Sequence, residues 1–232
     1  MHSLILLPGL ACDAEVWAGQ LPALTSAHRV HVSLVHFQHD TLPQMASALL
    51  AQHPGEHVFI GCSMGGMLAL EVARQAPQRV RGLALLGSTA RPDTPELLRL
   101  RAQACEWFAQ GRLDFVLRAN VSYAFHPIHA ADALLVARYV AMVKRAGAQA
   151  LIRQNRAVMA REDLRWLVPG ITCPAWVACG EADQLTIPEL SRELAAWMPQ
   201  ARLDIIPGCG HMLTLEEPER VTALLCAWLL RF

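Results

Sequence analysis

A single serine interrupts the apolar segment "VFIGCSMGGMLAL", and its neighbours suit a catalytic role. Ser63 is the central residue of Gly61-Cys62-Ser63-Met64-Gly65, which fits the pattern G-x-S-x-G. A serine hydroxyl is a weak nucleophile at neutral pH, so it needs a base to take its proton and a carboxylate to orient that base. We therefore expect a histidine and an acidic residue elsewhere in the chain to act with Ser63.

Among ten histidines, His211 has the position that best suits the base. It lies in "PGCGHMLTLEEPE", a loop between a predicted strand and the final predicted helix, where Gly208 and Gly210 give the backbone freedom. Structural roles in strands, turns and helices account for eight others: His28, His31, His36, His39, His53, His57, His126 and His129.

The best candidate for the acid is Asp183 in "WVACGEADQLTIPE", three residues after Gly180 at the end of another predicted strand. Ser63, Asp183 and His211 then each follow a different strand, and open α/β sheets place their sites at such carboxyl ends. Asp93, after the fourth predicted strand, is a weaker candidate. A thiol nucleophile at Cys62 would need a shifted motif.

Short apolar segments alternate with longer amphipathic ones, which predicts βαβ units and a mainly parallel sheet with helices on both faces. The predicted strands are Leu4–Leu7, Arg29–Leu34, Val58–Cys62, Leu83–Leu86, Ala175–Cys179 and Leu203–Ile206. The predicted helices cover about 14–24, 41–53, 64–76, 189–198 and 217–230. Trp17 is expected to pack the first helix on the sheet, and Met67 is a candidate pocket residue.

The strand-to-helix turn at Ser63 explains the glycines of the motif. In so sharp a turn, side chains at positions 61 and 65 would collide with neighbouring backbone, and glycine avoids that collision. Gly66 lets the following helix pack closely on the sheet. Gly61, Gly65 and Gly66 are therefore predicted to shape the nucleophile's turn.

The alternation stops within residues 91–165, where Ala, Leu, Arg and Gln predict three or four helices. We interpret this segment as a helical insertion into a core domain of residues 1–90 and 166–232. The insertion has 12 basic residues against 7 acidic ones, a net charge of +5. The remainder has 8 basic and 13 acidic residues, a net charge of −5, so the two parts are complementary.

Composition narrows the functional classes. The 232 residues are 53% hydrophobic and 17% charged, which indicates a globular protein with a sizeable core. A formal net charge of zero gives no reason to expect nucleic acid or an anionic membrane as a partner. Seven scattered cysteines without CxxC spacing, and an N-terminus without a basic signal region, predict a cytoplasmic protein with reduced thiols.

Three motifs resemble the α/β-hydrolase superfamily, in the chain order serine, acid, histidine: "GCSMGG", "GEADQLTIP" and "GCGHMLTLEEPERV". The resemblance implies an α/β-hydrolase fold with Ser63, Asp183 and His211 as catalytic triad. It also implies an oxyanion hole of backbone N–H groups, which maps to Met64 and Leu10. Pro8 replaces the usual histidine of the loop that contains Leu10. The amino-terminal hairpin of many relatives is not found in this sequence, which predicts a sheet of about six strands.

The resemblance further implies hydrolysis of a carboxylic ester with a small or medium acyl group through an acyl-enzyme, without metal or cofactor. The chain is broadly similar to pimeloyl-acyl-carrier-protein methyl ester carboxylesterases, and we expect a monomer or small homo-oligomer. Basic residues of the insertion, such as Arg153, Arg156 and Arg161, would favour an anionic or carrier-linked substrate if they line the entrance. Alternatively, these arginines pair with the acidic core domain.

Other activities suit the same three residues. An enol-lactone or carbon–carbon bond hydrolase, or an acyltransferase, would use the same triad. A binding protein without catalysis remains a further alternative, which the intact set of motifs disfavours. A serine nucleophile argues against the superfamily's dehalogenases and epoxide hydrolases, which use aspartate.

Overall fold

Six parallel strands form one sheet in a computed structural model that describes residues 1–232. The sheet order is β2-β1-β3-β4-β5-β6, and every neighbouring pair is parallel. The strands are β1 (Ser3–Leu7), β2 (Arg29–Val32), β3 (His57–Cys62), β4 (Val80–Leu86), β5 (Ala175–Gly180) and β6 (Ala201–Ile206). The predicted fold class and the sheet of about six strands are confirmed.

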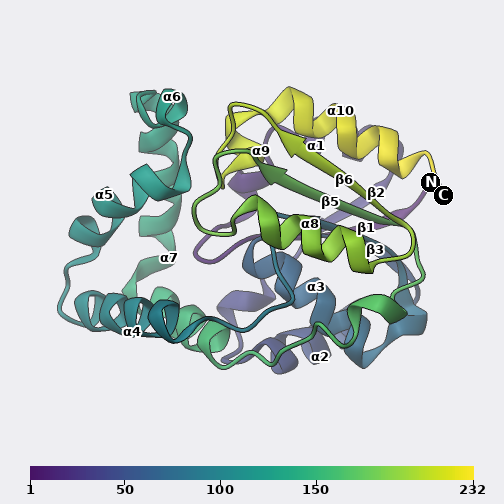
Figure 1. Cartoon of the computed structure of the whole chain (residues 1–232), viewed down its shortest axis with the longest axis horizontal. Helices are drawn as coiled ribbons and strands as arrows, with labels where there is room; N and C mark the ends of the chain where they lie inside the picture. The colour runs from purple at the N-terminus through teal and green to yellow at the C-terminus, as the bar shows by residue number, and fades with distance from the viewer.

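Helices cover both faces of the sheet because side chains of buried strands alternate between two apolar clusters. On β1, Leu4 and Leu6 pack in one cluster, whereas Ile5 and Leu7 pack in the other. The first cluster includes residues of α1 (Leu21–Ala27) and α10 (Pro218–Leu229), and the second includes residues of α2 (Leu42–Gln52), α3 (Met64–Gln75) and α8 (Pro188–Trp197). Figure 1 shows the two layers of helices around the sheet.

One predicted helix is divided in the structure, whereas the predicted helix 217–230 forms as α10 and follows an additional short helix. The segment 14–24 contains the 3₁₀ helix η1 (Ala14–Trp17) and then α1, with Gly19 between them. A Cβ atom at Gly19 would lie 2.6 Å from Pro218 Cβ, so the chain turns where it meets α10. Before α10 lies a short helix, α9 (Leu213–Glu216), and Pro218 starts a new helix because it cannot continue the previous one.

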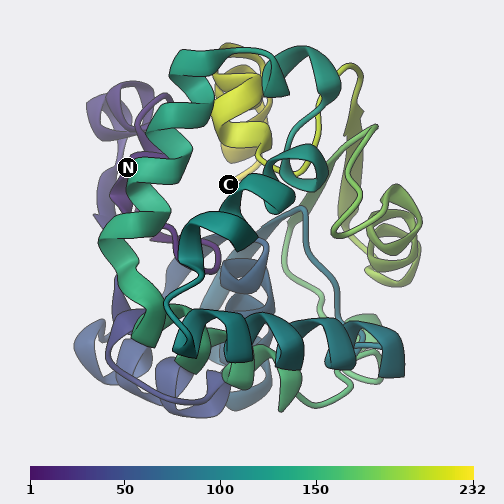
Figure 2. The same ribbon diagram turned by 90° about the vertical axis from the view of Figure 1, so that its left-hand side faces the viewer.

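Four helices lie between β4 and β5: α4 (Pro95–Ala109), α5 (Leu113–Ala124), α6 (Pro127–Ala130) and α7 (Ala133–Met159). Gly147 has φ 77° and ψ 162° and divides α7 into two helical parts. These helices lie at the side where β5 and β6 end (Figure 1), and Figure 2, seen from that side, shows them in front of the core. The division into core and insertion at residues 90/91 and 165/166 stays a prediction.

The basic insertion meets the acidic core through ion pairs. Arg145 Nη2 lies 2.9 Å from Asp13 Oδ2, and Arg138 Nε lies 3.3 Å from Glu15 Oε1. Further pairs of the same kind join Arg91 to Glu193 and Arg153 to Asp40. Because most of these groups are partly exposed, each pair contributes about 0–1 kcal/mol to stability.

The remaining short elements are 3₁₀ helices: η2 (Val35–Phe37), η3 (Pro77–Arg79) and η4 (Val168–Gly170). Thr41 caps α2 by accepting a hydrogen bond from Gln44 N, as its capping-box spacing predicts. No helix combines the length and the apolar content that a membrane span needs.

Candidate active site

Ser63 lies between β3 and α3 in a strained backbone conformation. Its φ of 51° and ψ of −116° fall in a region that residues with a side chain rarely adopt, at a cost of about 1–3 kcal/mol. Three hydrogen bonds hold the turn: Ser63 N donates to Leu86 O at 2.8 Å, while Ser88 Oγ and Gly66 N each donate to Ser63 O at 2.9 Å. The surrounding structure therefore presents the Ser63 side chain at the carboxyl end of the sheet.

The elbow glycines lie where no side chain would fit. A Cβ atom at Gly65 would lie 2.0 Å from Leu7 O, and one at Gly61 would lie 2.3 Å from the carbonyl group of Gly65. At Gly66 a Cβ atom would lie 2.5 Å from Ser88 Oγ. These contacts give the physical reason for the spacing of the motif, because β1, β3 and α3 approach one another at this turn.

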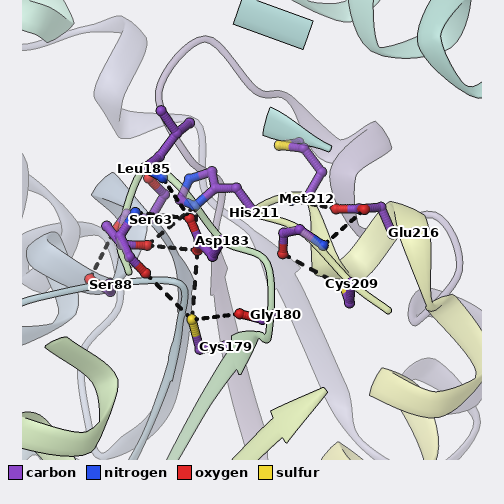
Figure 3. Close-up of polar contacts among 12 residues, drawn as sticks. Ser63, Ser88, Cys179, Gly180, Asp183, Leu185, Cys209, His211, Met212 and Glu216 are labelled. Atoms are coloured by element: carbon purple, nitrogen blue, oxygen red, sulfur yellow. Dashed lines mark hydrogen bonds and ion pairs between the residues drawn. The ribbon is translucent and has the colours of Figure 1, made fainter. Parts of the chain in front are cut away.

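Asp183 and His211 form a buried hydrogen-bonded pair. His211 Nδ1 donates to Asp183 Oδ2 at 2.8 Å, and the two side chains are 7% and 0% exposed. Figure 3 shows His211 beside Asp183. Thr186 completes the environment of the acid, because its N and Oγ1 each donate to the Asp183 carboxylate at 2.9 Å. Since Nδ1 is occupied, Nε2 is the nitrogen of His211 that remains for a serine hydroxyl.

Two loops carry this pair, and backbone contacts hold them together. The loop of Asp183 follows β5 and joins the loop of His211, which follows β6, through Ala182 N donating to Cys209 O at 2.9 Å. The carboxylate of Glu216 accepts from Met212 N at 3.0 Å (Figure 3) and from Gly210 N at 2.9 Å, on either side of His211. The imidazole is therefore fixed from both sides along its own loop.

The charges of the pair stabilise one another. Burial disfavours the carboxylate of Asp183, but His211 and the hydrogen bonds from Thr186 outweigh it and lower the pKa of Asp183. Burial likewise disfavours the imidazolium of His211, but the charge and hydrogen bond of Asp183 raise its pKa above the ordinary value. An ionised acid beside a titratable imidazole is the arrangement that proton transfer near neutral pH requires.

Ser63 and His211 line the same cavity, which has a volume of about 490 Å³. Most of the lining side chains are apolar, and they come from the core and from α4, α5 and α7 of the insertion. The Ser63 hydroxyl makes no hydrogen bond to His211 in this structure; such bonds are often long or misaligned in sites without substrate. Ser63 and His211 therefore both border a largely apolar chamber.

The two backbone groups expected to bind an oxyanion are both free. Neither Leu10 N nor Met64 N makes a hydrogen bond, and Leu10 lines the cavity beside Ser63. Met64 is the first residue of α3, where N–H groups lack partners within the helix. Two unpaired donors near the serine are suited to stabilising a developing negative charge.

The loop of Leu10 is anchored by a residue from the insertion. Gln154 of α7 is completely buried; its Oε1 accepts from Ala11 N at 2.7 Å and its Nε2 donates to His36 O at 3.1 Å. His36 Nε2 in turn donates to Cys12 O at 2.9 Å. Ala11 has a positive φ of 59°, so this network stabilises an unusual backbone turn directly after Leu10.

The other candidates for the acid and the nucleophile, Asp93 and Cys62, have surroundings that do not suit these roles. Asp93 binds Arg101 and Arg161 through its two carboxylate oxygens, at 2.7 and 2.8 Å, and makes no contact with His211. Burial raises the pKa of the Cys62 thiol well above its ordinary value, which opposes a thiolate nucleophile. Trp17 is buried in the core, whereas Met67 lines the cavity.

The arginines expected at the entrance do not line the cavity. Arg161 is bound to Asp93 and is only 7% exposed, and Arg153 contacts the carbonyl of Phe37 and the carboxylate of Asp40. Arg156 is exposed on α7, away from the lining residues. The alternative explanation, in which basic residues of the insertion pair with the acidic core, accounts for the position of Arg153.

Several residues of this site carry no sequence signal of their own. Thr186 acts through the Asp183 carboxylate, whereas Gln154 and Glu216 accept hydrogen bonds from backbone groups that include distant ones, and Arg101 is one of many arginines in the insertion. Thr186 and Glu216 had a usable cue, because they follow Asp183 and His211 within the quoted loop motifs. No group of three or more His, Cys, Asp or Glu side chains is arranged as a metal site.

A serine on a strand-to-helix elbow, at the edge of a parallel sheet that also carries a buried histidine–aspartate pair, defines a hydrolase of the α/β type. The sequence pattern of the alpha/beta hydrolase family matches residues 4–224, so the chain belongs to this family. It is a hydrolase acting on ester bonds.

Known proteins with a related sequence or structure include esterases and an enol-lactonase. The chain is 29% identical to the pimeloyl-acyl-carrier-protein methyl ester esterase of Edwardsiella ictaluri, covering 97% of this chain and 92% of that protein. Among solved structures, it resembles a malate-bound thermophilic esterase from Thermogutta terrifontis, with a TM-score of 0.90, 25% identity, and coverage of 100% and 90%. The enol-lactonase of Burkholderia xenovorans shares the fold, with a TM-score of 0.88, 23% identity, and coverage of 98% and 89%.

Proposed function

We propose that the protein hydrolyses a carboxylic ester through an acyl-enzyme on Ser63, with His211 as general base and acid and Asp183 as its orienting carboxylate. The observation that carries the proposal is the buried Asp183–His211 hydrogen bond of 2.8 Å, whose imidazole shares a cavity with the strained Ser63. The elbow glycines Gly61 and Gly65 support it by making that serine's turn possible.

The chemistry proceeds in two stages. His211 Nε2 takes the proton of Ser63 Oγ as that oxygen attacks the ester carbonyl carbon, and the imidazolium then protonates the departing alcohol oxygen. Water enters, gives its proton to His211 and attacks the acyl carbon, and the returning proton releases Ser63 and the free acid. Asp183 stays ionised throughout and stabilises the imidazolium in both stages.

Negative charge on the carbonyl oxygen develops near Leu10 N and Met64 N in both stages. Each such donor contributes about 3–4 kcal/mol in comparable sites. The donors need no partner within the protein, so they are available when the tetrahedral intermediate forms. Residues 91–165 form the cap in this proposal, because three of their helices supply lining residues of the cavity.

Substituting Gln154 with leucine should lower kcat by about tenfold to hundredfold with little change in KM. The variant leaves the N–H of Ala11 buried and unpaired, which costs about 1–3 kcal/mol and loosens the turn that carries Leu10. Steady-state kinetics, together with the affinity for an alkylboronic acid that mimics the tetrahedral intermediate, would measure the effect.

The matched control for that variant is Arg145→Met, which removes the ion pairs of α7 with Asp13 and Glu15 but leaves the hydrogen bond from Ala11 N to Gln154 in place. Its kcat should remain within about twofold of the wild type. If Gln154→Leu lowered only the melting temperature and left kcat and boronate affinity unchanged, the residue would have a structural role alone.

The substrate class is an ester with an anionic or carrier-linked acyl part and a small alcohol. Relatives named pimeloyl-acyl-carrier-protein methyl ester esterases support a methyl ester, and the apolar lining supports an aliphatic chain. We also propose a cytoplasmic location, which suits seven unpaired cysteines. The oligomeric state proposed is a monomer or a small homo-oligomer.

A panel of substrates tests the function. Methyl esters of graded chain length should be hydrolysed to the free acid, whereas enol-lactones and β-diketones of similar size should react at least about tenfold more slowly. Faster turnover of a lactone or diketone would favour the alternative hydrolase activities, and an acceptor-dependent ester product would indicate an acyltransferase. No turnover and no labelling by a fluorophosphonate would leave the binding-protein alternative.

A further inference from the structure

One lining residue of the cavity carries a permanent charge. Arg101 of α4 lies on the helix face that also presents Leu97, Leu100, Ala104 and Phe108 to the cavity. No Asp or Glu side chain lines this chamber. A lone cation among apolar side chains is costly unless something neutralises it, and the structure shows how much of that charge is compensated within the protein.

Compensation by the protein is incomplete. Arg101 Nε donates to Asp93 Oδ2 at 2.7 Å, but the other oxygen of Asp93 accepts from Arg161 Nη2 at 2.8 Å. One carboxylate therefore serves two guanidinium groups, and the cluster has a net charge of +1. Arg161 is buried and also bonded to the carbonyls of Arg91 and Val158, so it is directed away from the cavity.

The excess charge therefore lies at Arg101, which keeps donors to spare. Its Nη1 donates to Asn155 Oδ1 at 3.0 Å, while its Nη2 group makes no hydrogen bond. The side chain of Arg101 is 28% exposed. Burial lowers the pKa of Arg101, which marks a cation that has lost part of its hydration. Nη1 and Nη2 form the planar edge that matches a carboxylate.

Asn155 fixes this edge in place. Its side chain is buried and lines the cavity, and its Nδ2 donates to Leu151 O at 2.8 Å, so Oδ1 is the atom turned to Arg101. The charge of Arg101 also reaches the catalytic imidazole, since it is among the groups that oppose protonation of His211. Arg101 and His211 line the same cavity, so one small molecule bound there can meet both.

We propose that Arg101 is a specificity-determining residue that binds a carboxylate group of the substrate, so that the preferred substrates are half-esters of dicarboxylic acids. The inference rests on the proposed ester hydrolysis at Ser63 and narrows its substrate class. Apolar side chains around Arg101 accept the methylene chain, the guanidinium holds the free carboxylate, and the ester at the other end reaches Ser63.

The charge of Arg101 distinguishes two kinds of substrate, a free half-ester and a carrier-bound ester. An acyl chain tethered to a carrier has no free carboxylate at its distal end until the ester is cleaved. Several basic residues of the insertion are already paired with the core, among them Arg138, Arg145 and Arg153. A free half-ester is therefore the substrate that the unpaired charge inside the cavity favours over a carrier-bound ester.

The test compares monomethyl esters of dicarboxylic acids with their neutral carboxamide counterparts, which have nearly the same shape. At neutral pH, the wild type should show kcat/KM for the best half-ester about tenfold to hundredfold above that of its amide, mainly through KM. Arg101→Met should bring this ratio to about one, and Arg101→Lys should retain part of it because the lysine keeps a point charge. Arg156→Met is the matched control, since Arg156 is exposed outside the cavity, and its ratio should equal that of the wild type.

A ratio near one in the wild type, or an unchanged ratio in Arg101→Met, would overturn the inference. If Arg101→Met did not fold, the test would be competitive inhibition of the hydrolysis of a neutral p-nitrophenyl ester by adipate and by adipamide, in the wild type and in Arg101→Lys. Stronger inhibition by adipate that weakens in the lysine variant supports the inference. Equal inhibition by the two compounds refutes it. A further arm uses the same methyl half-ester with its free carboxyl group joined to pantetheine as a thioester. A higher kcat/KM for this thioester than for the free half-ester would also refute the inference. Ser63-dependent hydrolysis of neutral esters without any preference for carboxylates would leave the proposed function intact and remove only this inference.

Discussion

Replacing Ser63 with alanine should lower kcat for ester hydrolysis by about 10⁵- to 10⁶-fold, down to the small acceleration that binding and the oxyanion donors supply by themselves. The reason is that no acyl-enzyme can form without the hydroxyl. Substrate affinity should change little, because the cavity wall otherwise stays the same. Steady-state kinetics and mass spectrometry after fluorophosphonate treatment would measure this, with one adduct on the wild type and none on the variant.

Ser26→Ala provides the control for that substitution. Ser26 is an exposed residue of α1 whose hydroxyl donates only to the Ala23 carbonyl, so its loss should leave kcat unchanged. Substantial activity of Ser63→Ala, or an adduct located at Cys62, would show that the nucleophile has been misassigned.

Substituting Asp183 with asparagine should lower kcat by about 10⁴-fold, because the amide favours the wrong tautomer of His211 and no longer stabilises its cation. The pH dependence should change as well. Only the neutral imidazole accepts the serine proton, so activity falls as pH decreases through the pKa of His211, which Asp183 raises in the wild type. Without that carboxylate, burial lowers the pKa, so the acidic limb of kcat/KM against pH should move to lower pH.

A parallel variant, Asp93→Asn, distinguishes the two acids considered for this role. Asp93 neutralises Arg101 and Arg161, so its loss should affect stability and substrate preference without moving the acidic limb. The opposite pattern, with an unshifted limb in Asp183→Asn and a shifted one in Asp93→Asn, would reassign the acid. A pH profile of both variants on the same ester is the decisive measurement.

The structure shows which of the basic residues in the insertion are paired with the core and which one lines the cavity. A net charge of +5 on the insertion suggested a basic entrance, but Arg138, Arg145 and Arg153 instead face acidic groups of the core. What remains for a substrate is one guanidinium inside the chamber, at Arg101. Selectivity then depends on a single desolvated charge, which is stronger than the same charge in water.

Local sequence patterns predict the parallel sheet and the sharp turn at Ser63. Apolar strands buried on both faces show in short windows of residues, and the glycines at 61 and 65 reflect collisions between backbone segments that any such turn produces. The order of the candidate residues along the chain could also be read, because each follows a strand and parallel strands end at one edge.

The support of the site and the other residues of its lining depend on contacts between residues far apart in the sequence. Gln154 contacts Ala11 across 143 residues of sequence, and Arg101 meets Asn155 only because α4 packs against the second part of α7. The division of the predicted helix 14–24 has the same origin, since Gly19, between its two parts, packs closely against Pro218. Periodicity encodes which face of an element is apolar, but it does not encode which distant backbone group a buried polar side chain will satisfy, and that pairing arises from packing.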